Sequence, residues 1–355
     1  MKNFFATRTG IVTAGVVIGS FAAVLQKVGN PANMGLCMAC FERDTAGALA
    51  LHRAGALQYI RPEIIGILLG ACAVSLRRGE FRSRGGSSAV VRFFLGAFAM
   101  IGALVFLGCP WRAFLRLAGG DLNAIAGILG LAAGVFVGAQ FLKRGFSLGR
   151  SRPAEGAAPG WVLPAAMVGL LALALADFGP LAPDVTDKVA PHAPLWISLG
   201  AGLVIGGLAQ RSRFCTMGAL RDLFIVRDVH LLLGVAGFAV AAFALNLAFG
   251  QFHAGFAGQP AAHTQQLWNF LGMVLAGLSF ALAGGCPGRQ LILAGEGDSD
   301  SAVFVLGMFA GAAFAHNFAL ASSGKGAGQF GPAAVVIGLV FALVVAAIMT
   351  RRRPA

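Results

Sequence analysis

One short motif occurs twice in this chain, each time at the end of a long apolar run. Residues 108–121 read GCPWRAFLRLAGGD and residues 285–298 read GCPGRQLILAGEGD, so that Gly-Cys-Pro, a following Arg and a closing Asp recur 177 residues apart. Each copy is a polar, cysteine-bearing break directly after an apolar segment. A duplicated break of this kind predicts a transporter-like membrane fold whose site is built from two repeated halves.

The composition is that of a membrane protein. Hydrophobic residues make up 57% of the chain and charged residues 12%, with a mean hydropathy of +0.79, which excludes an ordinary soluble domain. We expect an all-α integral membrane protein with about nine to ten transmembrane helices, because about ten runs approach the length that spans a bilayer. These runs cover residues 10–26, 57–76, 92–107, 121–142, 161–178, 195–210, 229–249, 266–283, 301–320 and 331–349.

The net charge of +13 would suit a nucleic-acid partner, but the basic residues have a better explanation. They gather in the loops 77–92 and 143–160 and at the C-terminus, whereas the loops near 179–194, 250–264 and 321–330 carry almost none. This asymmetry is the positive-inside signal, which places the two basic loops and the C-terminus in the cytoplasm. We therefore expect a multi-pass protein with the lipid bilayer, and no nucleic acid, as its partner. The first apolar run has no convincing cleavage site after it and is interpreted as a helix.

The repeat extends beyond the opening motif. Residues 35–44 read GLCMACFERD and residues 213–222 read RFCTMGALRD, so that Cys37, Arg43 and Asp44 correspond to residues 178 positions later, and Cys40 corresponds to Gly218. Downstream, two glycines spaced for close helix packing recur, Gly130 and Gly134 as Gly307 and Gly311. These matches predict a first membrane repeat at 1–150, a linker with one transmembrane helix at 151–194, a second repeat at 195–330, and a final transmembrane helix with a basic tail at 331–355.

A single linker helix between the halves makes the internal repeat inverted. The sequence thus predicts four short re-entrant helices that bear cysteines, two from each membrane face, meeting near the middle of the bilayer. In each Gly-Cys-Pro motif the proline suits the first position of a helix, so Cys109 and Cys286 are expected at the N-cap. A helix N-terminus attracts anions, and a thiol there is a weak donor with a soft, polarisable sulfur. The alternative is that each motif is only a turn with a buried cysteine.

Several other polar residues are candidates with open alternatives. Arg112 and Arg289 are expected to pair with Asp121, Glu296 or Asp298, or to bind a transient anion. The Arg43-Asp44 and Arg221-Asp222 pairs are either structural ion pairs or substrate contacts. Polar side chains inside spanning helices are functional candidates, although a histidine there can serve packing alone; they are Gln140, His316 and Asn317. His52 is expected at an interface or exposed, and Cys72 in the core.

The spacing of Cys37 and Cys40 is that of a redox pair or half of a metal site. No second C-x-x-C and no nearby histidine pair completes a zinc site, so no metal is predicted. The chain shows no phosphate loop, catalytic triad or paired carboxylates. We therefore expect no enzyme activity and no cofactor, and any transport would be passive or coupled to an ion.

The cysteine motifs resemble a known family. RFCTMGALRD and GCPGRQLILAGEGD, with their first-half counterparts, are similar to the YeeE/YedE sulfur-transport family of bacterial inner-membrane proteins. The stretches VLQKVGNPANMGLCMACFERDTAGALALHRA, QYIRPEIIGILLG and GALVFLGCPWRAFLRLAGGDLNAIAG resemble its YedE branch, whose members are described as selenium transporters.

The resemblance implies an hourglass of short helices around a central constriction. There, cysteines of the thiosulfate-transporting members pass the anion along by thiol hydrogen bonds, and the matching positions are Cys37, Cys109, Cys215 and Cys286. The chain departs from the pattern by having cysteines in all four breaks, an additional Cys40 and an insert in the first break. These departures leave open whether thiosulfate itself is the substrate.

The sequence thus predicts a bacterial inner-membrane transporter for a small selenium- or sulfur-containing anion. Cys37, Cys109, Cys215 and Cys286 would line its path, supported by Cys40, Arg43, Arg112, Arg221, Arg289, Gln140, His316 and Asn317. One alternative is a membrane thiol-redox protein that uses Cys37 and Cys40. Another is a membrane anchor that delivers selenium to a cytoplasmic sulfur or selenium carrier protein at the basic loops, and such a carrier is a partner to be considered for the transporter as well.

Overall fold

The computed structural model describes residues 4–176, 181 and 191–351, and it is almost entirely helical. The end of the run expected at 161–178, most of the loop 179–194 and the basic tail from residue 352 lie outside the described residues. The long helices are α1 (Arg8–Lys27), α3 (Pro62–Arg77), α4 (Ala89–Phe106), α6 (Asn123–Lys143), α7 (Ala158–Leu175), α8 (Leu195–Ser212), α10 (His230–Ala248), α11 (Gln266–Ala283), α13 (Ser299–Asn317) and α14 (Gly331–Arg351).

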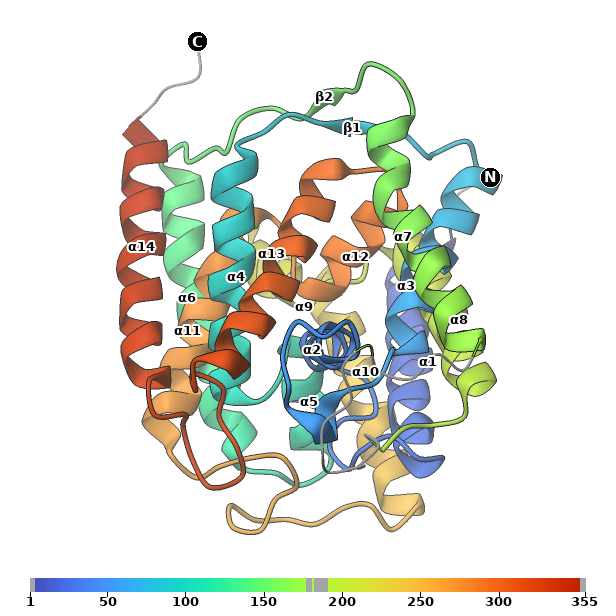
Figure 1. The fold of residues 1–355 in the computed structure, drawn as a ribbon, viewed down its shortest axis with the longest axis vertical. Coiled ribbons are helices and arrows are strands. Elements are labelled where there is room, and N and C mark those ends of the chain that lie inside the picture. The colour runs from blue at the N-terminus through green and yellow to red at the C-terminus, as the bar shows by residue number, and fades with distance from the viewer. Residues whose placement is uncertain (1–3, 177–180, 182–190, 352–355) are drawn as a thin grey trace.

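Four short helices each lie between two long ones in the chain: α2 (Met38–Ala48), α5 (Pro110–Ala118), α9 (Thr216–Val226) and α12 (Pro287–Gly295). The remaining elements are two single 3-10 turns, η1 (Phe4–Ala6) and η2 (Gly55–Leu57), and the two-residue strands β1 (Arg84–Gly85) and β2 (Arg152–Pro153), which pair antiparallel. In Figure 1 the short helices lie toward the middle of the molecule, with long helices on either side of them.

The described part of the chain has nine helical segments long and apolar enough to cross a membrane. The expected all-α multi-pass membrane fold is therefore confirmed. The run predicted at 195–210 forms α8, which is not among the nine. Its last turn carries Gln210, Arg211 and Ser212, and these polar residues lower its hydropathy.

Glycines let helices from the two halves approach closely. A Cβ added to Gly19 of α1 would collide with the carbonyl oxygen of Phe238 in α10, and one added to Gly206 of α8 would collide with that of Ile67 in α3. Glycines on α6 and α13 pack in the same manner against α11 and α4. Small residues at such crossings allow backbones to pack without intervening side chains.

The helix pairings follow the repeat. The closest helix pairs are α1 with α10, α3 with α8, α4 with α13 and α6 with α11, so each half packs mainly on the other. If α1–α6 correspond to α8–α13 in order, the first two pairs map onto each other, and so do the last two. This is the arrangement that an inverted repeat predicts. Helices α7 and α14 lie outside it, with α7 on α3 and α14 on α4 and α11. The boundaries at 150, 194 and 330 stay predictions.

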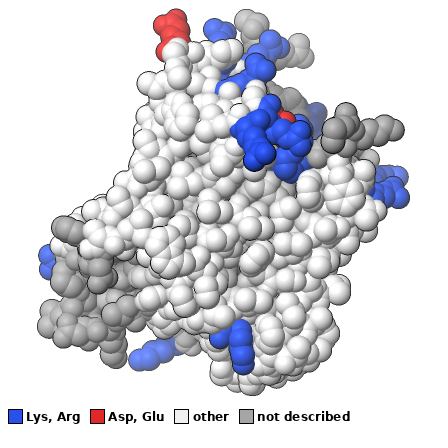
Figure 2. All heavy atoms as spheres, turned by 90° about the vertical axis from the view of Figure 1, so that its right-hand side faces the viewer, with Lys and Arg blue, Asp and Glu red and all other residues white. Residues whose placement is uncertain are grey.

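The two ends of the helix bundle differ in charge. Both described chain ends lie at the end that carries β1 and β2, where the two basic loops meet (Figure 1). Figure 2 shows most of the visible Lys and Arg near this upper end and a few at the lower edge, with a broad surface of almost no charge between them. A band without charges between polar ends is the surface that a lipid bilayer would cover.

Candidate functional site

Each of the four short helices begins directly after a cysteine. The N-cap residues of α2, α5, α9 and α12 are Cys37, Cys109, Cys215 and Cys286, all with extended backbone. The Sγ of Cys37 accepts the backbone N–H of Cys40 at 3.3 Å, and the Sγ of Cys215 accepts that of Gly218 at 3.2 Å. In α5 and α12 a proline follows the cap, and the cysteine makes no cap hydrogen bond. The predicted N-cap positions of Cys109 and Cys286 are confirmed.

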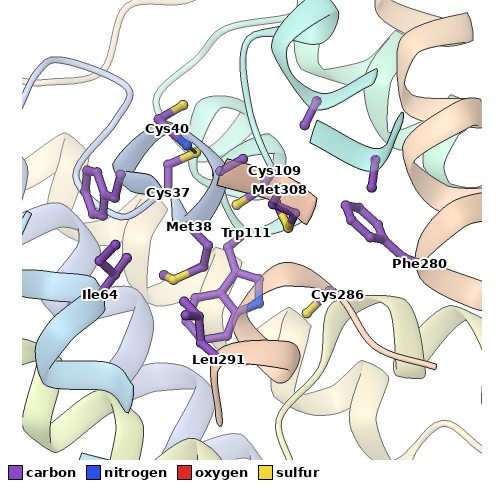
Figure 3. Packing of buried hydrophobic residues seen from close by; sticks show 14 of the residues in the cluster. Cys37, Met38, Cys40, Ile64, Cys109, Trp111, Phe280, Cys286, Leu291 and Met308 are labelled. Carbon is purple, nitrogen blue, oxygen red and sulfur yellow. Dashed lines mark hydrogen bonds between the residues drawn. The ribbon is translucent and has the colours of Figure 1, made fainter. Parts of the chain in front are cut away.

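The four thiols form two pairs, one within each half. The Sγ atoms of Cys215 and Cys286 are 3.6 Å apart. Cys37 and Cys109 lie beside each other, with Cys40 next to them (Figure 3). All are free thiols, so each pair is two sulfur atoms in contact and not a disulfide. The structure therefore brings all four predicted cysteines to the centre of the bundle.

Trp111 lies close to the short helices of both halves, beside Met38 of α2 and Leu291 of α12 (Figure 3). The side chain is fully buried and packs edge-to-face on Phe214 with ring centroids 5.2 Å apart. Its counterpart in the second half is Gly288, and a Cβ at Gly288 would lie only 3.0 Å from the indole ring. One half thus supplies a large ring and the other leaves room for it. The indole N–H has no hydrogen-bond partner among the described residues.

A cavity of about 520 Å³ leads from the end with the basic loops to Cys215. Its lining includes the backbone at Gly218 and Gly284 and four arginines, which are Arg211, Arg213, Arg221 and Arg289. A second cavity of about 250 Å³ adjoins it through shared arginines and also contains Glu80, Gln210 and Glu296. We refer to the two together as the arginine vestibule.

The walls of the arginine vestibule carry four arginines and four carboxylates, and the carboxylates are Glu80, Asp222, Asp228 and Glu296. Arg221 pairs with Asp222 at 2.8 Å, and Arg289 reaches Glu296 at 3.5 Å. Arg213 makes no ion pair with any described residue. Hydrogen bonds from Gln210 and Arg211 lower the pKa of Glu80. Partly exposed arginines near a helix N-terminus are suited to hold a small anion.

The equivalent region of the first half is closed. Arg112, the counterpart of Arg289, is fully buried and donates to the carbonyl oxygens of Asn33 at 2.7 Å and Ala261 at 3.2 Å. It also donates to the Sγ of Cys40 at 3.2 Å. The two loops that carry Asn33 and Ala261 are further joined by a hydrogen bond from Asn33 to Gln259. Arg112 thus holds two loops over the thiol pair of Cys37 and Cys109.

The aspartates of the two halves also differ in environment. Asp44 is fully buried between Arg43 and Arg61, with 2.6 Å to each guanidinium. Asp222 pairs with Arg221 alone, and both side chains are partly exposed. Both predicted Arg-Asp neighbours are therefore ion pairs, one buried and one at the wall of the arginine vestibule.

Two expectations about single residues were wrong. Asp121 pairs with Arg116 at 2.6 Å and not with Arg112, because Arg116 is one helical turn closer to it. His52 is buried and not interfacial: its Nδ1 accepts from Ala54, so its Nε2 donates to the carbonyl oxygen of Arg43 at 2.9 Å. This burial lowers the pKa of His52.

Three supporting candidates lie away from the cysteines. His316 stacks on His52 with ring centroids 4.5 Å apart, and Asn317 donates to the carbonyl oxygen of Leu51 at 2.9 Å. Both therefore hold the loop after α2. Gln140 is at the C-terminal end of α6 and is not part of the arginine vestibule. Cys72 lies in α3, outside the short helices, as expected.

Sequence reasoning missed Arg61, Arg211, Arg213 and Trp111. Arg61 lies in a loop whose sequence does not show that it returns to Asp44. The repeat could have indicated Trp111, because a tryptophan in one half and a glycine at the equivalent position of the other half suggest that the two residues pack together. Among the described residues, no group of three or more His, Cys, Asp or Glu side chains could hold a metal ion.

Comparisons with known proteins match parts of this chain. A family model described as "Sulphur transport" matches residues 211–353, the part that contains Cys215, Cys286 and most of the arginine vestibule. The chain is also 34% identical over 100 residues to the "Thiosulfate transporter TsuA" of Escherichia coli (strain K12). This match covers 27% of the chain and 27% of the length of that protein.

Proposed function

We propose that this protein transports a small sulfur-containing anion through the cysteine centre. The observation that carries the proposal is the arrangement of two thiol pairs at helix N-termini, one of them at the base of a cavity lined by four arginines. The similarity of residues 211–353 to a sulfur-transport family supports the same substrate class.

The geometry suggests the order of contacts. Arginine side chains of the vestibule would balance the charge of the anion, and the thiols of Cys215 and Cys286 would then donate weak hydrogen bonds to it. Trp111 is fully buried and packs on the short helices of both halves near the thiols, so we expect the indole ring to move when the anion passes. Its unpartnered N–H would offer the anion one more donor on the way. Arg112 would release the loops at Asn33 and Ala261 when the far end opens.

The finer assignments belong to the same proposal. We place the protein in a bacterial inner membrane with the basic loops, the arginine vestibule and the C-terminus in the cytoplasm. Selenium-containing anions are candidate substrates beside thiosulfate, because thiols suit any soft chalcogen atom. With this orientation, the open vestibule faces the cytoplasm, where a sulfur or selenium carrier protein could bind next to it.

The test is transport by the purified protein in liposomes, with labelled thiosulfate, sulfite, selenite and selenide compared. We expect the wild type to accumulate at least one of them. Changing Cys37, Cys109, Cys215 or Cys286 to Ala should slow uptake by roughly tenfold or more, since each change removes a hydrogen bond to a charged group. Cys72→Ala is the matched control, because that cysteine is buried outside the short helices. Wild-type rates in all four variants would exclude a thiol path.

A redox function of Cys37 and Cys40 predicts a different result. Cys40 accepts a hydrogen bond from Arg112, and Cys37 is bound to the N–H of Cys40, so the two thiols are near each other but reduced. Full transport by Cys40→Ala would exclude a required disulfide. A mixed disulfide trapped with a second protein would favour the redox function instead.

A further inference from the structure

Glu42 is a buried carboxyl group without any partner. It lies on α2, its side chain is fully buried, and neither carboxyl oxygen has a hydrogen-bond partner among the described residues. The other fully buried acidic residues all have partners: Asp44 has Arg43 and Arg61, Glu63 has Asn30 and Ser198, and Asp121 has Arg116 and Asn123. An isolated ionisable group at membrane depth is costly and marks a functional site by default.

Packing does not explain the glutamate. Position 42 corresponds to Leu220 of α9 in the second half, so the repeat accepts an apolar side chain there. Glu42 is also one helical turn from Met38, which lies beside Trp111 near the thiols (Figure 3). Side chains on a helix lean toward its N-terminus, which for Glu42 is the end capped by Cys37.

The surrounding elements offer no counter-charge. Helix α2 packs against α3, α4, α12, α13 and η2. Most of the charged and titratable groups near this interface have other partners: Glu63 has Asn30, Arg92 has Ser87 and Asp300, Arg289 has Glu296, and Arg43 has Asp44. His316 packs on the ring of His52, and its Nε2 has no hydrogen-bond partner among the described residues. None of these described groups forms a hydrogen bond with the carboxyl oxygens of Glu42. The state described here therefore favours the neutral, protonated acid.

We propose that Glu42 is a proton-binding site that takes up and releases one proton in each transport cycle, so that the anion and a proton cross together. This inference rests on the proposed transport function. An anion at the Cys37 cap would lie about 7–8 Å from Glu42 along the helix axis, close enough to favour the protonated acid. When the anion leaves and water reaches the centre, the carboxyl group passes its proton to water. No electron transfer or covalent change is involved.

The experiment compares wild type, Glu42→Gln and Glu63→Gln in liposomes with labelled thiosulfate and a trapped pH dye. The membrane potential is clamped and a gradient of one pH unit is imposed. One proton per anion would raise wild-type accumulation by about tenfold and acidify the lumen. Glu42→Gln keeps the size of the side chain but cannot release a proton, so accumulation should stay near one-fold while one-for-one anion exchange continues. Glu63→Gln is a buried control whose carboxyl already has partners, and it should keep the tenfold effect.

The outcomes separate the two proposals. Tenfold accumulation and lumen acidification by Glu42→Gln would overturn the proton site, and so would a wild type that exchanges anion without responding to the gradient. A wild type that neither exchanges nor accumulates thiosulfate or selenite would overturn the transport function itself. Glu42→Leu, which copies the residue of the second half, serves as a second variant if the amide disturbs folding, and it should lose the gradient response in the same way.

Discussion

The two repeated aspartates show how much the environment of a residue matters. Asp44 lies between two arginines and is shielded from solvent, whereas the side chains of Asp222 and Arg221 keep 24% and 34% of their exposure. Removing one partner of a buried ion pair leaves the other charge buried and unpaired, but an exposed pair contributes little. The same residue pair thus has different roles in the two halves.

We expect Asp44→Asn to lower the free energy of unfolding by about 3–5 kcal/mol, because Arg43 and Arg61 lose their carboxylate. Asp222→Asn is the matched control and should change it by about 0–1 kcal/mol. Denaturation of both variants in the same detergent measures the difference. Equal effects would mean that Asp44 is not a structural ion-pair partner.

At the scale of elements, glycines decide how the helices cross. In α8, Gly206 faces the backbone of α3, whereas a Cβ at Gly200 of the same helix would meet nothing within 4 Å. A helix pair held by backbone contact cannot accept a methyl group without moving apart. The repeat places Gly19 of α1 at the equivalent crossing with α10.

Gly206→Ala should therefore lower the free energy of unfolding by about 1–3 kcal/mol through overpacking against Ile67. Gly200→Ala should leave it unchanged or raise it by up to about 1 kcal/mol, since alanine favours the helix. Thermal unfolding of the two variants, in one helix and one detergent, tests the contrast. A stable Gly206→Ala protein would show that α3 and α8 can separate freely.

The whole molecule is asymmetric although its helices are repeated. In the second half, the arginine vestibule leads openly to Cys215. In the first half, the equivalent region is closed by Arg112 and the two loops that it binds. In transporters built from inverted repeats, alternating access comes largely from one repeat moving against the other around a fixed site. If the protein transports as proposed, we expect a second state in which Arg112 lines a cavity and Arg289 is buried.

The proposed orientation predicts the sidedness of labelling. Glu155 and Ala257 are exposed at opposite ends of the bundle, and all six native cysteines are buried. A bulky membrane-impermeant thiol reagent should therefore label Glu155→Cys only in inside-out vesicles and Ala257→Cys only in right-side-out vesicles. The reverse labelling pattern would mean that the protein has the opposite orientation in the membrane. The unsubstituted protein gives the background level of labelling.

Much of the fold followed from local sequence. Apolar runs located the long helices to within a few residues, and the Gly-Cys-Pro motifs located the starts of α5 and α12. The polar last turn of α8 explains why that helix has the weakest signal of a span. The partners in ion pairs were harder to predict from the sequence. Asp121 was a predicted partner of Arg112, but the geometry of α5 places Arg116 next to Asp121 instead.

The sequence by itself determined the membrane fold, the internal repeat and the cysteine caps of α5 and α12, because hydropathy and caps depend on neighbours within a few residues and a repeat can be read directly from the residues. Only the tertiary structure decided which thiols meet, that Trp111 fills the space left by Gly288, that Glu42 has no partner and which end is open. Those features depend on contacts between segments far apart in the chain. They also depend on which of the two similar halves is open and which is closed, and the repeated sequence alone does not distinguish the halves in this respect.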